Sequence, residues 1–208
     1  IASFLSEPVQ VEEIYVYMQT NYGTSVTPFY TTLALWVGGI VLVALMKVKV
    51  DYEDDEFKDA TEHQKYIGRA LLFLAMGQLQ ALVVVLGDLY ILKIDCTHPF
   101  MLWLAAAITS FVFTLFIYTL VLTFGDLGKA IAVVMIVLQI AGSGGTYPIE
   151  LLPEFFQNVY LYFPFPYAIN AMREAISGLY QCDYAVFLVK LCAYAVISLI
   201  PVSYTHLR

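Results

Sequence analysis

Charged side chains are scarce in this chain of 208 residues: Asp, Glu, Lys and Arg make up 13% of it, whereas 61% of the residues are apolar. A soluble domain usually carries about 25% charged residues. Four windows hold no Asp, Glu, Lys or Arg at all, namely 27–46, 70–87, 96–125 and 130–149. Each approaches or exceeds the roughly 18–20 residues that a helix needs to cross the hydrocarbon core. The composition therefore indicates a membrane protein and excludes a soluble enzyme, a nucleic-acid-binding protein and a secreted disulfide scaffold.

Residues with catalytic or metal-binding chemistry are also few. The cysteines Cys96, Cys182 and Cys192 are scattered, whereas a zinc site requires paired ligands at short spacing. The segment Gly125–Lys129 lacks the four-residue spacer and the Ser or Thr of a P-loop. We also find no Gly-x-Ser-x-Gly, His-Glu-x-x-His or Cys-x-x-Cys pattern. We therefore expect no enzymatic activity, no metal and no cofactor in this chain.

The apolar windows, with a fifth stretch interrupted only by Lys190, predict an all-α polytopic membrane protein. Five transmembrane helices are expected, at about 27–46, 67–92, 100–124, 129–143 and 184–203. Counting Lys and Arg on alternate sides gives six on one side and two on the other, with none in residues 1–26. The positive-inside rule then predicts a multi-pass cell-membrane protein with its N-terminus outside and its C-terminus in the cytoplasm.

An odd number of helices with an external start suggests that an earlier membrane helix and an external segment precede Ile1. Residues 1–26 are interpreted as the end of that external domain, and 27–201 as the membrane domain. Asn21–Gly23 is expected to form a turn, with Thr27 and Pro28 at the entry to the first helix. Residues 202–208 form a doubtful tail, because they resemble translated sequencing-adapter read-through.

The segment 144–183 does not read as an ordinary loop and predicts an external helical hairpin. It follows Gly142, contains Gly144 and Gly145 near its start, and is then interrupted by Pro148, Pro153 and Pro164. Its apolar pieces are too short to span a bilayer. They fit equally a re-entrant hairpin and one that lies at the membrane interface, where tyrosines are enriched. Both arrangements remain open at this point.

A few polar side chains lie inside the apolar windows, where they are energetically costly. Asp88 and Lys190 are expected at similar depths, roughly 7–10 Å below the outer surface, and are predicted to form an ion pair. The alternative is that Lys190 extends its stem towards the headgroups. Glutamines such as Gln78, Gln80 and Gln139 more often join helices through hydrogen bonds than line a transport path.

Three separated strings are similar to a known family. They are Tyr22–Gly38 (YGTSVTPFYTTLALWVG), Gly142–Pro153 (GSGGTYPIELLP) and Pro166–Gly178 (PYAINAMREAISG). In this order they resemble the C-terminal membrane region of the YhgE/Pip family, the phage infection proteins of Gram-positive bacteria, within the ABC type-2 permease superfamily. In such permeases a Pro-x-x-Tyr, followed six residues later by Arg, lies outside before the last helix. The matching residues here are Pro164, Tyr167 and Arg173, with Glu174 next in the chain.

The resemblance implies one N-terminal helix and a large external domain ahead of these five helices. It also implies a permease half, forming a homodimer or heterodimer in the lipid bilayer. A separate cytoplasmic ABC ATPase would drive export of a hydrophobic, lipid-linked or peptide substrate. The alternative is a non-transporting surface protein that acts as a phage receptor or as a secretion or assembly factor. No nucleic-acid partner is expected.

The charged loop 47–66 has two possible roles: a solvated connector, or a docking surface for a cytoplasmic partner. In type-2 permeases the equivalent loop carries the helix that couples to the ATPase, so the resemblance implies the second role. The candidate coupling residues are Lys58, Asp59, Glu62, Lys65 and Tyr66.

Overall fold

The computed structural model describes residues 21–48, 61–145 and 149–205, and all regular secondary structure within them is helical. The expectations for residues 1–20, Lys58, Asp59, Pro148 and 206–208 lie outside the described residues. The elements are α2 (Tyr22–Leu45), α3 (Glu62–Leu86), η2 (Gly87–Ile91), α4 (Pro99–Phe124), α5 (Asp126–Gly142), η3 (Ile149–Leu151), α6 (Glu154–Val159), η4 (Tyr160–Tyr162), α7 (Phe165–Ser177) and α8 (Asp183–Thr205).

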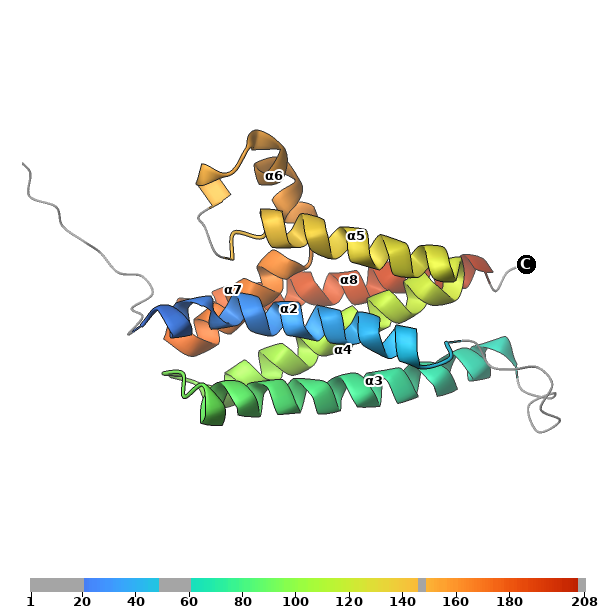
Figure 1. Cartoon of the computed structure of the whole chain (residues 1–208), viewed down its shortest axis with the longest axis horizontal. Coiled ribbons are helices and arrows are strands. Elements are labelled where there is room, and N and C mark those ends of the chain that lie inside the picture. Colours follow the sequence, from blue (N-terminus) through green and yellow to red (C-terminus); the bar gives the residue numbers. More distant parts are fainter. Residues whose placement is uncertain (1–20, 49–60, 146–148, 206–208) are drawn as a thin grey trace, which may run out of the picture.

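The long helices are aligned with the long axis of the molecule (Figure 1). Three helical segments in the described part of the chain are long and apolar enough to cross a membrane: Tyr22–Leu45, Tyr66–Ile91 and Pro99–Phe124. The remaining two long helices, α5 and α8, have 17 and 23 residues. The prediction of an all-α membrane protein is confirmed.

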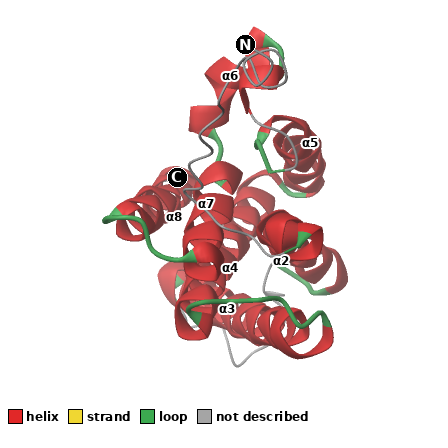
Figure 2. Ribbon diagram, turned by 90° about the vertical axis from the view of Figure 1, so that its left-hand side faces the viewer, coloured by secondary structure: helices red, strands yellow, loops and turns green. Residues whose placement is uncertain are grey.

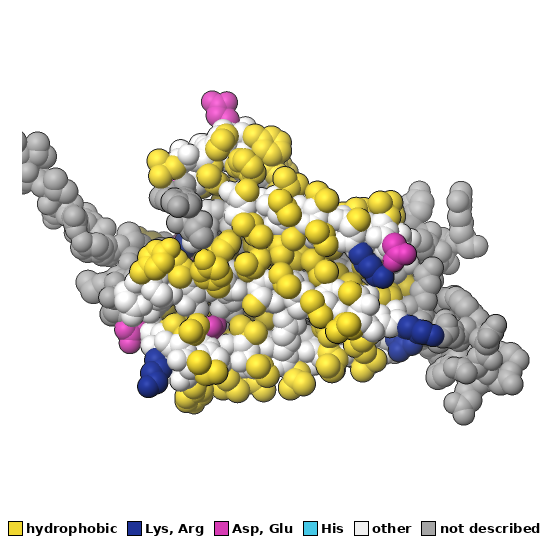
Figure 3. Space-filling view, in the orientation of Figure 1, with side chains coloured by type: hydrophobic (Ala, Val, Ile, Leu, Met, Phe, Trp, Pro, Cys, Tyr) yellow, Lys and Arg dark blue, Asp and Glu magenta, His cyan; other side chains and the backbone are white. Residues whose placement is uncertain are grey.

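The two ends of the bundle differ in what they carry. We call the end at which α2 and α4 begin the α7 end, and the opposite end, where the chain passes from α2 to α3, the loop end (Figure 1). On the face shown in Figure 3, apolar side chains cover the middle of the bundle. Charged side chains gather near its two ends and on the protruding hairpin. An apolar band between charged ends is the surface that a bilayer requires.

The start of the first helix differs from the prediction. Helix α2 begins at Tyr22, because the side chain of Asn21 accepts a hydrogen bond from the backbone N–H of Thr24 at 2.8 Å. Asn is a favoured N-cap residue, and here it extends the helix upstream of Pro28. Pro28 therefore lies inside α2, and the expected turn at Asn21–Gly23 is wrong.

Helix α3 begins with a capping box, in which Thr61 and Gln64 exchange side-chain-to-backbone hydrogen bonds. Its last turn widens into the π-helical element η2, where the N–H of Leu92 donates to the carbonyl of Gly87. The expected span 67–92 thus ends in a π turn that contains Asp88. Such turns occur often at functional sites.

Helix α4 is the centre of the bundle. It packs against α2, α3, α5, α7 and α8, and Figure 2 shows it surrounded by other helices. Its expected bounds, 100–124, differ from the observed ones by one residue. A helix that is apolar all round is expected to be largely buried, and α4 is the most buried of the three candidate spans, although Phe100, Phe111 and Phe124 stay exposed.

The external segment splits into two arms with different environments. The first arm, formed by η3, α6 and η4, has no fully buried residue and projects from the bundle (Figure 2). The second arm, α7, is inserted among α2, α4 and α8. The first arm therefore projects from the helical bundle, whereas the second packs inside it; the position of the hairpin relative to the membrane stays a prediction.

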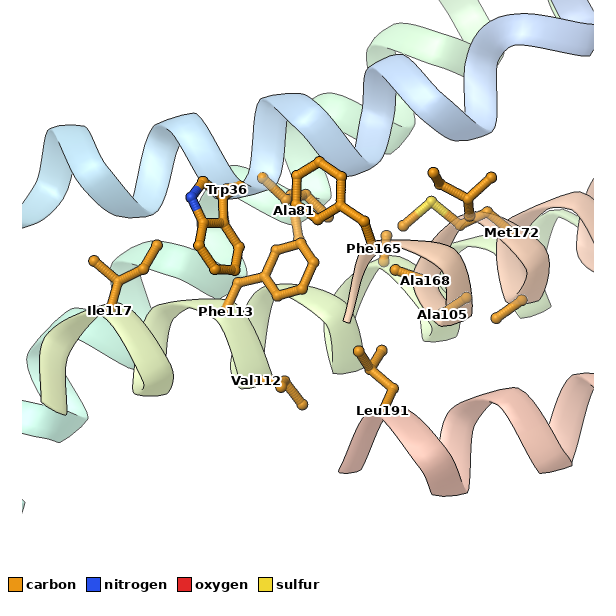
Figure 4. Packing of buried hydrophobic residues seen from close by; sticks show 14 of the residues in the cluster. Trp36, Ala81, Ala105, Val112, Phe113, Ile117, Phe165, Ala168, Met172 and Leu191 are labelled. Atoms are coloured by element: carbon orange, nitrogen blue, oxygen red, sulfur yellow. The ribbon is translucent and has the colours of Figure 1, made fainter. Parts of the chain in front are cut away.

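Phe165, the first residue of α7, shows how deep this helix reaches. Its fully buried ring lies 5.5 Å from the ring of Trp36 and 5.4 Å from that of Phe113 (Figure 4). Trp36 and Phe113 each lie fourteen residues, about 21 Å, into their own helices. The 13 residues of α7 then return about 20 Å towards the α7 end. We call α7 the re-entrant helix, because it starts in the middle of the bundle and returns to the end at which α2 and α4 begin.

A close backbone approach at the start of α5 gives the first testable prediction. A Cβ at Gly128 would lie 2.3 Å from the carbonyl oxygen of Leu120, a backbone atom that cannot rotate away. A Gly128→Ala substitution is expected to lower the free energy of unfolding by about 1–3 kcal/mol, measured in detergent. Gly68→Ala, where a Cβ meets nothing within 4 Å, is the matched control and should be neutral or stabilising. Equal stability of the two variants would contradict the close packing of α4 and α5.

Candidate functional site

The re-entrant helix α7 carries most of the residues of the predicted external motif. Pro164 and Pro166 lie at its start, where the lack of a proline N–H leaves no intrahelical bond unmade. Pro164 and Pro166 are buried together with Phe165. The prolines therefore lie where the helix begins, at the deepest point of the hairpin. A non-helical residue added at this buried position would leave its backbone N–H and C=O groups unpaired.

The other end of α7 is held by the loop between η2 and α4. The backbone N–H groups of Thr97 and His98 donate to the carbonyls of Ile176 and Ala175, both at 3.0 Å. These bonds satisfy carbonyls that a helix C-terminus leaves free. Cys96 adds a weaker thiol contact to Ala175 at 3.6 Å, and burial raises the pKa of this thiol. The loop 92–98 thus anchors the returning end of α7.

Glu174 is fully buried, although it stands in the external motif. Its carboxylate accepts a hydrogen bond from the backbone N–H of Tyr180 at 2.6 Å. Its carbonyl accepts from Gly178, whose φ of +116° ends the helix. Glu174 thereby ties the turn between α7 and α8 to the body of α7.

Tyr167 and Arg173 lie on the less buried face of the same helix. The Tyr167 hydroxyl donates to the carbonyl of Leu161 at 2.7 Å, which joins α7 to the first arm. Arg173 donates to the side-chain oxygen of Asn170 at 3.0 Å. The structure therefore brings Pro164, Tyr167, Arg173 and Glu174 together on one helix, as the spacing of the motif requires.

The glycines ahead of the hairpin allow tight packing. A Cβ at Gly142 would lie 2.8 Å from the ring of Phe156, and one at Gly145 would lie 2.4 Å from that of Phe29. Gly144 has a positive φ of +64°. Pro153 directly precedes α6. These positions shape the passage from α5 to the first arm and present no reactive group.

The predicted ion pair between Asp88 and Lys190 is not formed. The buried carboxylate of Asp88 accepts a hydrogen bond from the Thr31 hydroxyl at 2.6 Å, between η2 and α2. The ammonium group of Lys190 lies 5.5 Å from the centre of the Tyr167 ring. Similar depth does not make two side chains neighbours: Asp88 faces α2, whereas Lys190 faces α7.

Other polar side chains join the helices across their apolar contacts. Gln80 donates to the carbonyl of Ala34 in α2, and Gln78 donates to that of Ala107 in α4. These bonds agree with the expected role of the glutamines. Gln139 differs: it is fully buried, and among the described residues neither its amide nitrogen nor its oxygen has a hydrogen-bond partner.

At the loop end, the structure gives Tyr66 a role inside the bundle. Its hydroxyl lies 3.2 Å from that of Thr119, and its carbonyl accepts from Tyr118. The hydroxyl and the carbonyl of Tyr66 therefore both contact α4. Glu62 and Lys65 belong to the first turn of α3.

A cavity of about 410 Å³ opens at the same end. It lies between the end of α2, the end of α4 and the start of α5. Lys129 and Asp126 line it and form an ion pair at 3.0 Å. Across residues 21–48, 61–145 and 149–205 we find no group of three His, Cys, Asp or Glu side chains of the kind that holds a metal ion.

Comparison with known proteins defines the class to which this helical membrane unit belongs. Residues 61–204 match the family described as "ABC-2 family transporter protein". The chain therefore belongs to the ABC-2 transporter family. It is also 31% identical, over 173 residues, to the uncharacterized protein YhgE of Bacillus subtilis (strain 168). The predicted resemblance to YhgE and to type-2 permeases is confirmed.

The aligned region covers 83% of this chain and 22% of the Bacillus protein. The chain thus spans about a fifth of the length of that relative. No solved structure matches the chain.

The buried carboxylate of Glu174 gives a second prediction. A Glu174→Ala variant loses the acceptor for Tyr180 and is expected to lower the free energy of unfolding by about 1–3 kcal/mol. Glu174→Gln keeps one side-chain acceptor and should lose less. The exposed Glu154, replaced by Ala, is the control and should change stability by less than about 0.5 kcal/mol. Thermal unfolding in detergent that ranks Glu154→Ala beside Glu174→Ala would refute the anchoring role of Glu174.

Proposed function

We propose that this chain is the membrane-spanning permease part of an ABC-2 exporter. In this proposal it moves a hydrophobic, lipid-linked or peptide substrate, and a separate cytoplasmic ATPase supplies the energy. The observation that carries the proposal is the family match over residues 61–204, which covers α3 to α8. The chain itself contributes no catalytic step, and two copies or two related chains form the complete permease.

The proposed orientation places the loop end in the cytoplasm and the α7 end outside. Lys47, Arg69 and Lys129 lie towards the loop end, which supports this orientation under the positive-inside rule. All five long helices, including α5 and α8, then serve as membrane spans. Helix α7 enters from the outer surface.

The ATPase is proposed to bind at the loop end, through the segment 47–66 and the rim of the adjacent cavity. The ion pair of Lys129 and Asp126 leaves 39% and 96% of these side chains exposed, so charged groups are accessible there. Tyr66 supports the base of this surface through its contacts with α4.

The experiment uses the full-length protein, reconstituted in liposomes with the ABC ATPase from the same source. Charge reversal by Lys58→Glu or Lys65→Glu should weaken stimulation of ATP hydrolysis at least about tenfold, because like charges then meet at the interface. Lys93→Glu, at the opposite end of the bundle, is the matched control and should leave stimulation unchanged.

If the wild-type protein never stimulates the ATPase, the exporter proposal is wrong. The protein would then act at the surface without transport, as a receptor or an assembly factor. If both reversals retain full stimulation while the wild type is active, the docking surface lies outside 47–66.

A further inference from the structure

Two buried polar side chains at the end of α5 have no hydrogen-bond partner among the described residues. They are Gln139, which is fully buried, and Ser143, which is buried at the C-cap of the helix. The unpaired atoms are the amide nitrogen and oxygen of Gln139 and the hydroxyl of Ser143. They are three of the six buried side-chain atoms without a partner in the described part of the chain, so such atoms concentrate at this place.

Both side chains belong to the packed face of α5. Gln139 and Ser143 are four residues apart, which places them on one side of the helix, next to Gly142. Helix α5 packs against α2, α4 and α6. A Cβ at Gly142 would lie 2.8 Å from the ring of Phe156, so α6 covers this end of the packed face. We call Gln139 and Ser143 together the α5 amide site.

Gln139 does not serve as a link between helices, unlike the two glutamines of α3. Gln78 and Gln80 each donate to a backbone carbonyl of a neighbouring helix. A buried amide that forms no hydrogen bond lowers stability, because it has lost its bonds to water and gained none in exchange. The unpaired amide of Gln139 therefore calls for a partner that the described bundle does not itself supply.

The unpaired atoms define which chemical group fits the site. The side chain of Gln139 has N–H donors and a carbonyl acceptor in one plane, so a second amide can satisfy both. The Ser143 hydroxyl adds a group that can donate or accept. Helix α2 contains no charged residue, and α5 contains none after Lys129. A charged ligand would meet no counter-charge from these two helices, which favours an uncharged amide.

The site lies close to the α7 end of the bundle. Gln139 is three residues before Gly142, the last residue of α5, which is about 4.5 Å along the helix axis. The first arm, which covers this end, has no fully buried residue. A displacement of the first arm therefore uncovers little of the core, whereas a displacement of α7 would uncover Phe165. The first arm is the element that can open the site.

We propose that the α5 amide site binds an uncharged amide group of the transported substrate. The inference rests on the proposed exporter function and narrows its substrate class to molecules that carry such an amide. Two sources share this chemistry, namely the peptide bond of a peptide and the acetamido group of a lipid-linked sugar. Gln139 donates to the carbonyl of the substrate amide and accepts from its N–H, while Ser143 supplies a further hydrogen bond.

The test measures the binding of two pairs of probes to the full-length protein in dodecyl maltoside, through the shift in melting temperature. Octyl N-acetylglucosaminide is compared with octyl glucoside, which lacks the acetamido group. A blocked trileucine peptide is compared with its analogue in which esters replace the amides. At least one amide probe should bind about tenfold more tightly than its amide-free analogue, because the analogue leaves Gln139 unpaired. The pair that shows this difference identifies the source of the amide.

Substitution of the glutamine separates a binding role from a structural one. Gln139→Met keeps the length of the side chain and removes its polar atoms. It should weaken binding of the amide probe about tenfold and raise the melting temperature without probe by about 2–4 °C, because no unpaired amide stays buried. Gln78→Met is the matched control. It removes the bond to the Ala107 carbonyl, so it should lower the melting temperature and leave the affinity unchanged.

Ser143→Ala should weaken binding about threefold. If Gln139→Met does not fold, Gln139→Asn, which carries the amide on a shorter side chain, takes its place and should also weaken binding.

A melting temperature that falls in Gln139→Met, as in Gln78→Met, would overturn the proposal, since Gln139 would then be a structural link. Equal affinities for the amide probes and their amide-free analogues, or no binding of either amide probe, would also overturn it. The assay contains no ATPase, so these results leave the exporter proposal intact. A protein that binds an amide probe but never stimulates the ATPase would contradict the exporter role and leave the amide-binding site in place.

Discussion

The packing of the Phe165 ring between Trp36 and Phe113 is the contact on which the rest of the architecture depends. It joins the start of the re-entrant helix α7 to the middles of α2 and α4, and Trp36 also donates to the carbonyl of Ala132 in α5 at 3.2 Å. Four elements thus meet at one buried cluster, whose three aromatic rings are shown in Figure 4. Aromatic rings at these distances prefer particular relative orientations, in addition to the gain from burying their surface. The cluster therefore fixes how far α7 reaches into the bundle.

The depth of Phe165 restricts where the polar groups of α7 can find hydrogen-bond partners. Helix α7 must return about 20 Å to the end of the bundle, and its C-terminal carbonyls meet the N–H groups of Thr97 and His98 there. The less buried side of α7 carries Tyr167, Asn170 and Arg173, and on this side the ring of Tyr167 contacts that of Tyr194 in α8. The residues of the family motif therefore have three different roles in one helix. Pro164 precedes its first residue, Glu174 is buried and holds the turn after it, and Tyr167 and Arg173 lie on its less buried side.

The sequence predicted the helices whose bounds depend on the length of an apolar run. It did not predict features that depend on contacts between residues far apart in the chain. Helix α4 was predicted to within a residue because no charged side chain interrupts it, whereas the start of α2 was misplaced because Pro28 outweighed the Asn21 cap. The proline-rich pieces gave no depth for the hairpin within the bundle, and only the packing of Phe165 against Trp36 and Phe113 supplies it. Depth matched Asp88 to Lys190, but depth carries no information about which face of a helix a residue occupies. The three-residue spacing of Tyr167, Asn170 and Arg173 is typical of one face of a helix, but the sequence analysis did not use this pattern.

The most direct test of the re-entrant helix is a double-mutant cycle between Trp36 and Phe165, using Leu at each position. The free energy of unfolding is measured for the full protein in detergent. The structure predicts a coupling energy of about 0.5–1.5 kcal/mol, because each ring loses the same partner contact. A cycle of Trp36→Leu with Phe100→Leu, whose ring is 70% exposed, should be additive. Additive losses in the Trp36–Phe165 cycle would show that α7 does not reach the middle of the bundle.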